Sequence, residues 1–213
     1  AIKEAKKYCA VNVAASSEDR NFTYAPKQDA WRLDPNAAYV HYTSNETIGG
    51  VEFHWVPTTG DAPLVADMSS HFLSQPIDVA KFGLIYAGAQ KNVGPAGLTV
   101  VIVRDDLLGQ ALPATPTMLD YKTQADNESM YNTPPCFSIY IAGLTFQWLK
   151  KLGGLRAMEE KNLAKATLLY DVLDRSDFYH SPVAKDDRSR TNVPFTLSNP
   201  DLDSAFLNEA KAQ

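Results

Sequence analysis

Four apolar segments, separated by polar and turn-forming residues, occupy the first half of the chain. The first alternates apolar and polar positions and is rich in aromatic and β-branched residues, which is typical of a strand. The other three are nearly continuous apolar runs, a pattern that favours strands covered on both faces. We expect all four to join one largely parallel sheet. They are residues 38–44 (AYVHYTS), 64–70 (LVADMSS), 82–89 (FGLIYAGA) and 98–104 (LTVVIVR).

The second half of the chain predicts two long helices, residues 132–154 and 154–177, after an irregular stretch at 110–131. Thr133 is expected to cap the first helix, with Pro134 as its first helical residue. A strand at 190–198 and a last helix are expected to follow. Each long helix has an apolar stripe at helical spacing that we expect to be core. The stripes are Phe137, Tyr140, Ile141, Leu144 and Trp148, then Met158, Ala166, Leu169, Tyr170 and Leu173.

Alternating strand and helix signals predict an α/β fold with a mostly parallel sheet flanked by helices. Composition also limits the kind of protein this chain can be. The 213 residues are 45% hydrophobic and 21% charged, which is ordinary for a globular protein, and the net charge of −5 does not favour nucleic acid or anionic membranes. No apolar stretch reaches the roughly 20 residues that span a bilayer. Both ends interrupt helical patterns, so we expect a piece of a longer protein.

Cysteine and histidine usage limits the chemistry. Two cysteines, Cys9 and Cys136, are too few for a disulfide framework and favour a reducing, cytoplasmic compartment. The four histidines have no metal-ligand spacing, so we expect no metal site.

One lysine, Lys91, lies in a glycine-rich turn between two of the predicted strands. Most lysines in turns simply extend into solvent. A phosphate-binding P-loop does not fit, because that motif needs the lysine after its last glycine and a Ser or Thr next. The third interpretation is a lysine that bonds covalently to pyridoxal phosphate (PLP).

A PLP site also needs a carboxylate that keeps the pyridine nitrogen protonated. Asp67 ends the preceding apolar run, where ligand crevices lie in open α/β sheets. Two neighbouring strand ends would thus present an acid and a lysine to one crevice. An aspartate at a strand end is more often a simple turn residue, so this pair alone does not decide between the interpretations.

The motifs around Lys91 and Asp67 decide between these interpretations. HYTSNETIGG, ADMSS, IYAGAQKNVGPAGLTVVIVR, YNTPPCFSIY and RSRTNVPF, in this order, closely resemble the phosphoserine aminotransferase family. The resemblance covers essentially the whole chain. It implies the PLP-dependent transferase fold, with residues 1–175 in the PLP-binding large domain and 176–213 beginning a smaller α+β C-terminal domain.

The resemblance also implies an activity: transamination between O-phospho-L-serine and 2-oxoglutarate, giving 3-phosphohydroxypyruvate and L-glutamate, in serine biosynthesis. Bacterial members also serve vitamin B6 synthesis. Lys91 matches the catalytic lysine, Asp67 the partner of the pyridine nitrogen, and Gln90 a contact to the cofactor phosphate. Thr47 matches a hydroxyl beside the ring oxygen. Asn132 and Thr133 match a pair that reaches the cofactor phosphate of the neighbouring subunit, which implies a homodimer with composite sites.

The family's stacking aromatic ring, its glycine-rich phosphate loop and its substrate-holding arginines and histidine have no match in this chain. We therefore expect residues 1–213 alone to be inactive. Two alternatives remain at this point: a non-catalytic folding or assembly fragment, and another PLP enzyme such as a cysteine desulfurase.

Overall fold

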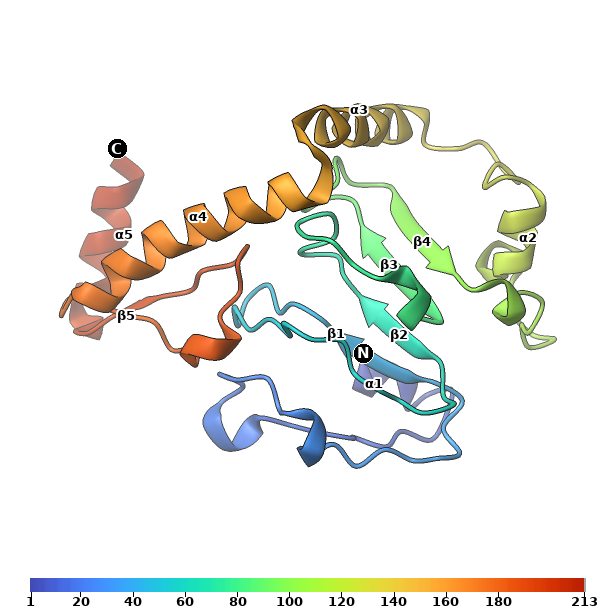
Figure 1. The fold of residues 1–213 in the computed structure, drawn as a ribbon, viewed down its shortest axis with the longest axis horizontal. Coiled ribbons are helices and arrows are strands. Elements are labelled where there is room, and N and C mark those ends of the chain that lie inside the picture. Colours follow the sequence, from blue (N-terminus) through green and yellow to red (C-terminus); the bar gives the residue numbers. More distant parts are fainter. Residues whose placement is uncertain (213) are drawn as a thin grey trace. The chain divides into compact units, whose positions relative to one another are not determined.

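A four-stranded sheet with the order β1-β2-β3-β4 organises the middle of the chain (Figure 1). The first three strands are parallel, and β4 runs antiparallel to β3. In this computed structural model, which describes residues 1–212, all four predicted strands are present, although each is shorter than its apolar segment. Their bounds are Val40–Thr43, Leu64–Asp67, Leu84–Gly88 and Thr99–Val103.

The chain divides into two compact units. One unit contains the sheet and consists of residues 35–44 and 56–158. The other consists of residues 1–34, 45–55 and 159–213. We call them the sheet unit and the second unit.

The two faces of the sheet differ because side chains alternate along each strand. Val40, Tyr42 and Leu64 are buried on one face, together with Ala66, Ile85 and Ala87. The same register places His41, Thr43, Asp67 and Tyr86 on the opposite face, where they are half-buried. These four residues, each with a polar group, therefore share one face.

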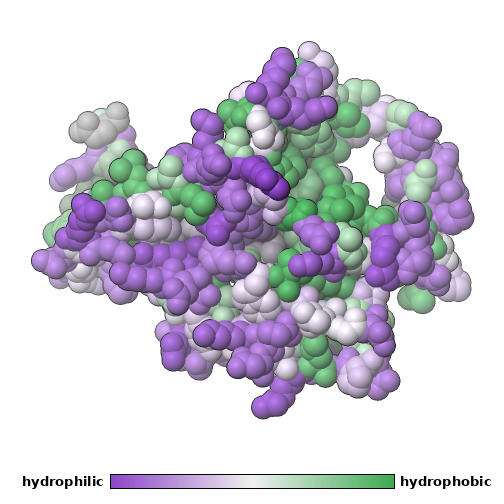
Figure 2. All heavy atoms as spheres, in the orientation of Figure 1, coloured by the Kyte–Doolittle hydropathy of each residue, from purple (hydrophilic) through white to green (hydrophobic). Residues whose placement is uncertain are grey.

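The expectation that β4 is covered on both faces was wrong. Its Val101 and Ile102 are exposed, and Figure 2 shows hydrophobic residues at the surface in this region. The direction of β4 has a physical cause. Only the turn from Ala89 to Leu98 separates it from β3, whereas a parallel crossover needs a dozen residues or more.

The first long helix, α3, begins later than the sequence predicts. It spans Cys136–Leu152, with Pro135 at the N-cap position, so Thr133 is not its cap and Pro134 is not helical. The reason is the Pro134–Pro135 pair, because a residue that precedes proline is disfavoured in the helical conformation. The predicted C-terminal end is confirmed: Gly153 has φ +107°, a left-handed value suited to glycine.

The prediction that the apolar stripe of α3 is core was also wrong. Phe137, Tyr140 and Trp148 are 72%, 65% and 54% exposed, and Leu144 is exposed as well. The buried residues of α3 are instead Ser138, Ala142 and Leu149. The helical period was recognised correctly, but no segment of the sheet unit covers the stripe.

The remaining elements are short, except for α4. This helix spans Gly154–Arg175 and buries Ala166 and Leu173 of its predicted stripe, whereas Leu169 is exposed. The expected strand at 190–198 is reduced to β6, which pairs with β5. The irregular stretch at 110–131 contains one short helix, α2. The bounds are Ile2–Ala5 (α1), Tyr121–Asp126 (α2), Tyr179–His180 (β5), Thr196–Leu197 (β6) and Asp203–Ala212 (α5).

Within residues 1–212, no helix combines the length and the apolar character needed to cross a membrane.

Candidate active site

Asp67 is the last residue of β2, at the edge of the sheet where the parallel strands end. Its Oδ1 accepts a hydrogen bond from the backbone N–H of Ser69 at 2.9 Å, and its backbone carbonyl accepts one from the Ser44 hydroxyl at 3.1 Å. The side chain is half-buried. The first bond holds the carboxylate and the second holds the backbone of Asp67, while the residue stays partly accessible to a ligand.

A histidine and a tyrosine lie close to this carboxylate on the same face of the sheet. His41 Nε2 is 3.0 Å from the Tyr86 hydroxyl, and the two rings are stacked at 6.0 Å. Burial, with a further contribution from Asp67, raises the pKa of Tyr86 to about 12. Burial also lowers the pKa of His41, and Asp67 acts in the opposite direction. The sequence showed no sign of this cluster, because its members come from three separate strands.

Lys91 lies in the turn that follows β3. The turn is closed by backbone hydrogen bonds: Ala89 N–H donates to Leu98 O at 2.9 Å, and Gly94 N–H donates to Ala89 O at 2.7 Å. Lys91 is exposed. Because β2 and β3 are parallel neighbours, Asp67 and the Lys91 turn lie at the same edge of the sheet. The predicted juxtaposition of the two strand ends is therefore present.

Packing beneath the turn restricts its motion. Val93 is buried, and the Asn92 side-chain amide donates to Phe72 O at 2.6 Å. On the α3 side, the Ser138 hydroxyl donates to Ala96 O at 3.0 Å, next to Gly97, whose φ is +92°. The exposed Lys91 is thus carried by a turn that is anchored on two sides.

Gln90, which precedes Lys91, folds back over Gly88. A Cβ atom on Gly88 would lie 2.7 Å from Gln90 Oε1, closer than real Cβ contacts, so a side chain at position 88 would displace the Gln90 amide. The Gly88 N–H donates to the Ser69 hydroxyl at 3.0 Å. Ser69 thereby joins the loop after Asp67 to the segment that carries Gln90 and Lys91. Neither Ser69 nor Gly88 was predicted as a site residue, although both lie inside the quoted motifs.

The other predicted residues belong to other segments of the chain. Thr47 is half-buried in a turn of the second unit. Asn132 and Thr133 are exposed in the segment that precedes α3. The described structure therefore brings Asp67, Gln90 and Lys91 together at one sheet edge.

The residues at this edge fit PLP chemically. The cofactor has a basic ring nitrogen, an aldehyde and a phosphate. Asp67 offers a fixed carboxylate for the nitrogen, Lys91 offers an accessible primary amine for the aldehyde, and Gln90 offers an amide donor for the phosphate. The structural observation that supports this fit is the hydrogen bond from the Ser69 N–H, which fixes the Asp67 carboxylate at the sheet edge shared with the Lys91 turn.

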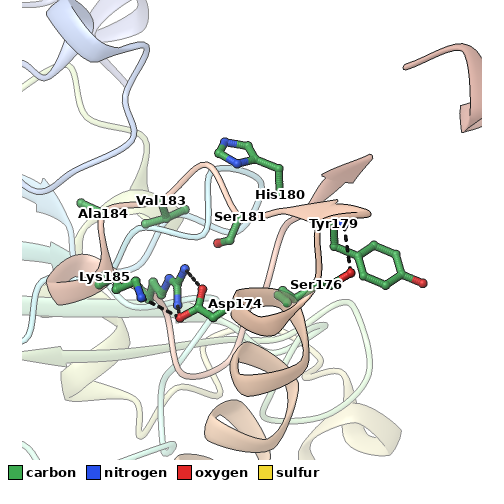
Figure 3. Close-up of a pocket in the computed structure, with 10 residues that line it drawn as sticks. Asp174, Ser176, Tyr179, His180, Ser181, Val183, Ala184 and Lys185 are labelled. Carbon is green, nitrogen blue, oxygen red and sulfur yellow. Dashed lines mark hydrogen bonds and ion pairs between the residues drawn. The ribbon is translucent and has the colours of Figure 1, made fainter. Parts of the chain in front are cut away.

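A cavity of about 440 Å³ is lined by none of the predicted site residues. It lies in the second unit, and Asp174 on its wall forms ion pairs with Lys185 at 3.0 Å and Arg188 at 2.7 Å (Figure 3). These cations, with their hydrogen bonds, hold the pKa of Asp174 well below its usual range.

Comparison with known proteins defines the family. Residues 1–213 match the model of the family described as aminotransferase class-V, and the chain therefore belongs to this family. It is 64% identical to a phosphoserine aminotransferase of Nitrosomonas europaea, over 100% of this chain and 60% of that protein. It is 62% identical to one of Herminiimonas arsenicoxydans, over 98% of this chain and 58% of that protein.

Solved structures give the same result. A phosphoserine aminotransferase from Bacillus circulans subsp. alkalophilus matches with a TM-score of 0.96 and 47% identity, over 99% of this chain and 59% of its own. The PLP-bound phosphoserine aminotransferase from Trichomonas vaginalis matches with a TM-score of 0.92 and 40% identity, over 99% and 61%. The resemblance seen in the sequence motifs and the α/β fold class are confirmed. The chain spans about 60% of the length of these relatives.

Proposed function

We propose that this chain forms the catalytic middle of a PLP-dependent phosphoserine aminotransferase. The reaction interconverts O-phospho-L-serine plus 2-oxoglutarate with 3-phosphohydroxypyruvate plus L-glutamate, in serine biosynthesis in the cytoplasm. The observation that carries the proposal is the location of Asp67 and the Lys91 turn at one edge of the sheet. The names of its similar relatives support it.

The proposed roles follow from the chemistry of each side chain. Lys91 holds the cofactor covalently and moves a proton at the substrate Cα atom. Asp67 keeps the ring nitrogen protonated, and Gln90 and Thr47 orient the phosphate and the ring oxygen. When bound, PLP supplies the electron sink for the carbanion that forms as the proton leaves.

We propose that the large domain ends with α4, at residue 175, and that residues 176–213 begin the small domain. The end of α4 at Arg175 and the β5–β6 pair that follows it support this division.

The complete gene product is expected to form L-glutamate from O-phospho-L-serine and 2-oxoglutarate, whereas residues 1–213 alone, with PLP in excess, are expected to be inactive. The relatives contain further chain that this segment does not match, and substrate positioning can supply roughly 7–11 kcal/mol of a barrier. The measurement is coupled detection of glutamate for both proteins side by side.

Three results would contradict this expectation. Comparable turnover by residues 1–213 would mean that the substrate site lies within this chain. Failure of the complete protein to bind PLP would favour the non-catalytic alternative. Sulfide release from L-cysteine, without transamination of phosphoserine, would favour a cysteine desulfurase.

We also propose a homodimer with composite sites, in which Asn132 and Thr133 contact the cofactor phosphate of the partner subunit. Their exposure supports this arrangement, as does the uncovered apolar stripe of α3 directly after them. A large exposed apolar patch is typical of a surface that is buried in an assembly.

Mixing inactive Lys91→Ala subunits with inactive Asn132→Ala/Thr133→Ala subunits is expected to restore about a quarter of the unaltered activity. Random exchange makes about half of the dimers mixed, and each mixed dimer has one site with neither defect. Turnover is measured after subunit exchange has been verified by mass spectrometry. Lys91→Ala subunits mixed with Lys91→Arg subunits are the control and should recover none. Absence of recovery in the first mixture would place the phosphate contacts within one chain.

A further inference from the structure

The turn that carries Thr47 is held together by its own backbone. We call residues 45–52 the Thr47 turn. Glu46 N–H donates to Val51 O at 2.7 Å, and Gly50 N–H donates to Glu46 O at 2.8 Å. Gly50 has φ +67°, a left-handed value that favours glycine. The backbone bonds close the loop, but its orientation depends on what packs against it.

A segment far away in the sequence packs against this turn within the second unit. We call residues 187–192 the strap. The Ser189 N–H donates to Gly50 O at 2.8 Å, and the Glu52 N–H donates to Asp187 O at 2.9 Å. The contact is so close that a Cβ atom on Gly50 would lie 3.0 Å from Asn192 O and 2.2 Å from Pro194 Cδ. The turn and the strap therefore form one packed pair of segments.

The Ser189 hydroxyl is the centre of the polar contacts between them. It donates to Asn45 Oδ1 at 2.5 Å and accepts from the backbone N–H groups of Thr191 at 3.2 Å and Asn192 at 3.0 Å. The Asn45 amide in turn donates to Asn192 Oδ1 at 2.8 Å. Ser189 is 0% exposed and Asn45 is 1% exposed. Because both residues are buried, loss of the hydroxyl would remove three hydrogen bonds at a place that solvent does not reach.

A buried carboxylate adds a second connection. Glu52, at the end of the Thr47 turn, is 1% exposed, and its Oε2 accepts from the Arg190 N–H at 2.8 Å. The Arg190 side chain extends to Glu159 of α4, with Nη1 and Oε1 2.7 Å apart. The strap is thereby connected to the turn on one side and to α4 on the other.

The last turns of α4 fix the strap further. The Tyr170 hydroxyl donates to Ser189 O at 3.0 Å, and the Arg188 guanidinium forms two hydrogen bonds with Asp174 at 2.7 and 3.0 Å. This ion-pair cluster is the one drawn around Asp174 in Figure 3. A chain of contacts thus runs from α4 through the strap to the turn that bears Thr47; it is exposed at Asp174, half-buried at Tyr170 and buried between Ser189 and Asn45.

We propose that Ser189 is a positioning residue: through Asn45 its hydroxyl fixes the Thr47 turn, and thereby the Thr47 side chain, for contact with the cofactor. The inference rests on the proposed function, because it uses the proposed contact of Thr47 with PLP. It adds a role for a serine that touches no cofactor and acts only through the turn.

Ser189→Ala in the complete gene product is expected to have two effects. In the cofactor-free protein, amide hydrogen exchange of a peptide covering residues 45–52 should become faster, because the turn loses its anchor. In PLP titrations, the Kd for PLP should rise about tenfold, which is the size of effect that residues in one hydrogen-bond network typically have on each other. The matched control is Ser198→Ala, which removes a hydroxyl bonded to Asp177 O at 2.7 Å in the same unit. It should change neither measurement.

A double-mutant cycle separates positioning from a general loss of stability. In a Thr47→Ala background, Ser189→Ala should raise the Kd by less than about twofold, because the residue through which it acts is gone. Should Ser189→Ala not fold, Asn192→Ala removes the acceptor of the Asn45 amide from the other side and takes its place in the same cycle.

Two outcomes overturn the inference. One is unchanged exchange of residues 45–52 in the variant. The other is an equal rise in Kd with and without Thr47, which would show that Ser189 acts on the fold as a whole. If the proposed function itself is wrong, the result differs: the unaltered protein then binds no PLP, whatever the rate of amide hydrogen exchange in the Thr47 turn.

Discussion

Replacing Lys91 with arginine in the complete gene product is expected to lower turnover by more than about 10⁴-fold while the protein stays folded. Arginine keeps the positive charge, but a guanidinium is not a useful nucleophile at neutral pH and does not exchange the proton at the substrate Cα atom. Lys91 is exposed in its turn, so the longer side chain fits without displacing core residues. Steady-state glutamate formation measures the effect.

The position of the cofactor bond is tested separately. Borohydride reduction, which makes the lysine–cofactor bond permanent, followed by peptide mapping should place the label on Lys91. Lys81, exposed in the same unit, serves as the matched control, and Lys81→Arg should leave turnover unchanged. Label on Lys81 or Lys122 would show that the glycine-rich turn was assigned the wrong role.

The second large effect is expected for Asp67→Asn. The variant should still bind PLP through Lys91, but its turnover should fall by about 10²–10³-fold, because a neutral amide does not keep the ring nitrogen protonated. Asparagine has nearly the same shape, and its side-chain oxygen can still accept the Ser69 N–H bond, so the fold should be retained. Single-turnover measurements with phosphoserine would separate this chemical step from binding.

A cofactor-independent measurement accompanies this test. Removal of the Asp67 charge should lower the pKa of Tyr86 from about 12 toward its ordinary value, because the carboxylate contributes to the rise. Ultraviolet difference titration of the variant against the unaltered protein would show it. Asp61→Asn, an exposed aspartate of the same unit, is the control for both readouts. Turnover of Asp67→Asn close to that of the unaltered protein would rule out the proposed role.

Several features of the site could be predicted from the sequence because they depend on local order along the chain. Asp67 and Lys91 each follow an apolar run, and β2 and β3 are found within those runs. Parallel neighbours end at the same edge, so the order of strands alone brought the acid and the lysine to one place. Motif resemblance then assigned the chemistry that spacing left open.

The residues that support the site could not be predicted in this way. Tyr86 and His41 approach Asp67 from neighbouring strands, and Ser189 reaches Asn45 across 144 positions of the sequence. Such contacts leave no periodic pattern. A buried serine and an exposed serine look the same in the sequence, because what distinguishes them is the segment that packs against them.

The sequence by itself determined the α/β class and the position of the strands and the long helices, since local periodicity reflects side-chain alternation and helix geometry. Asp67 and Lys91 became candidates through their places after apolar runs, and Gln90 through motif resemblance alone. Only the tertiary structure decided that β4 is antiparallel, that α3 begins at Cys136, and that its apolar stripe is exposed. These features depend on the length of a connection, on two adjacent prolines, and on which segments cover a face. Whether an apolar residue is buried depends on the segment that packs against it as much as on the residue itself, and only the folded chain determines which segment that is.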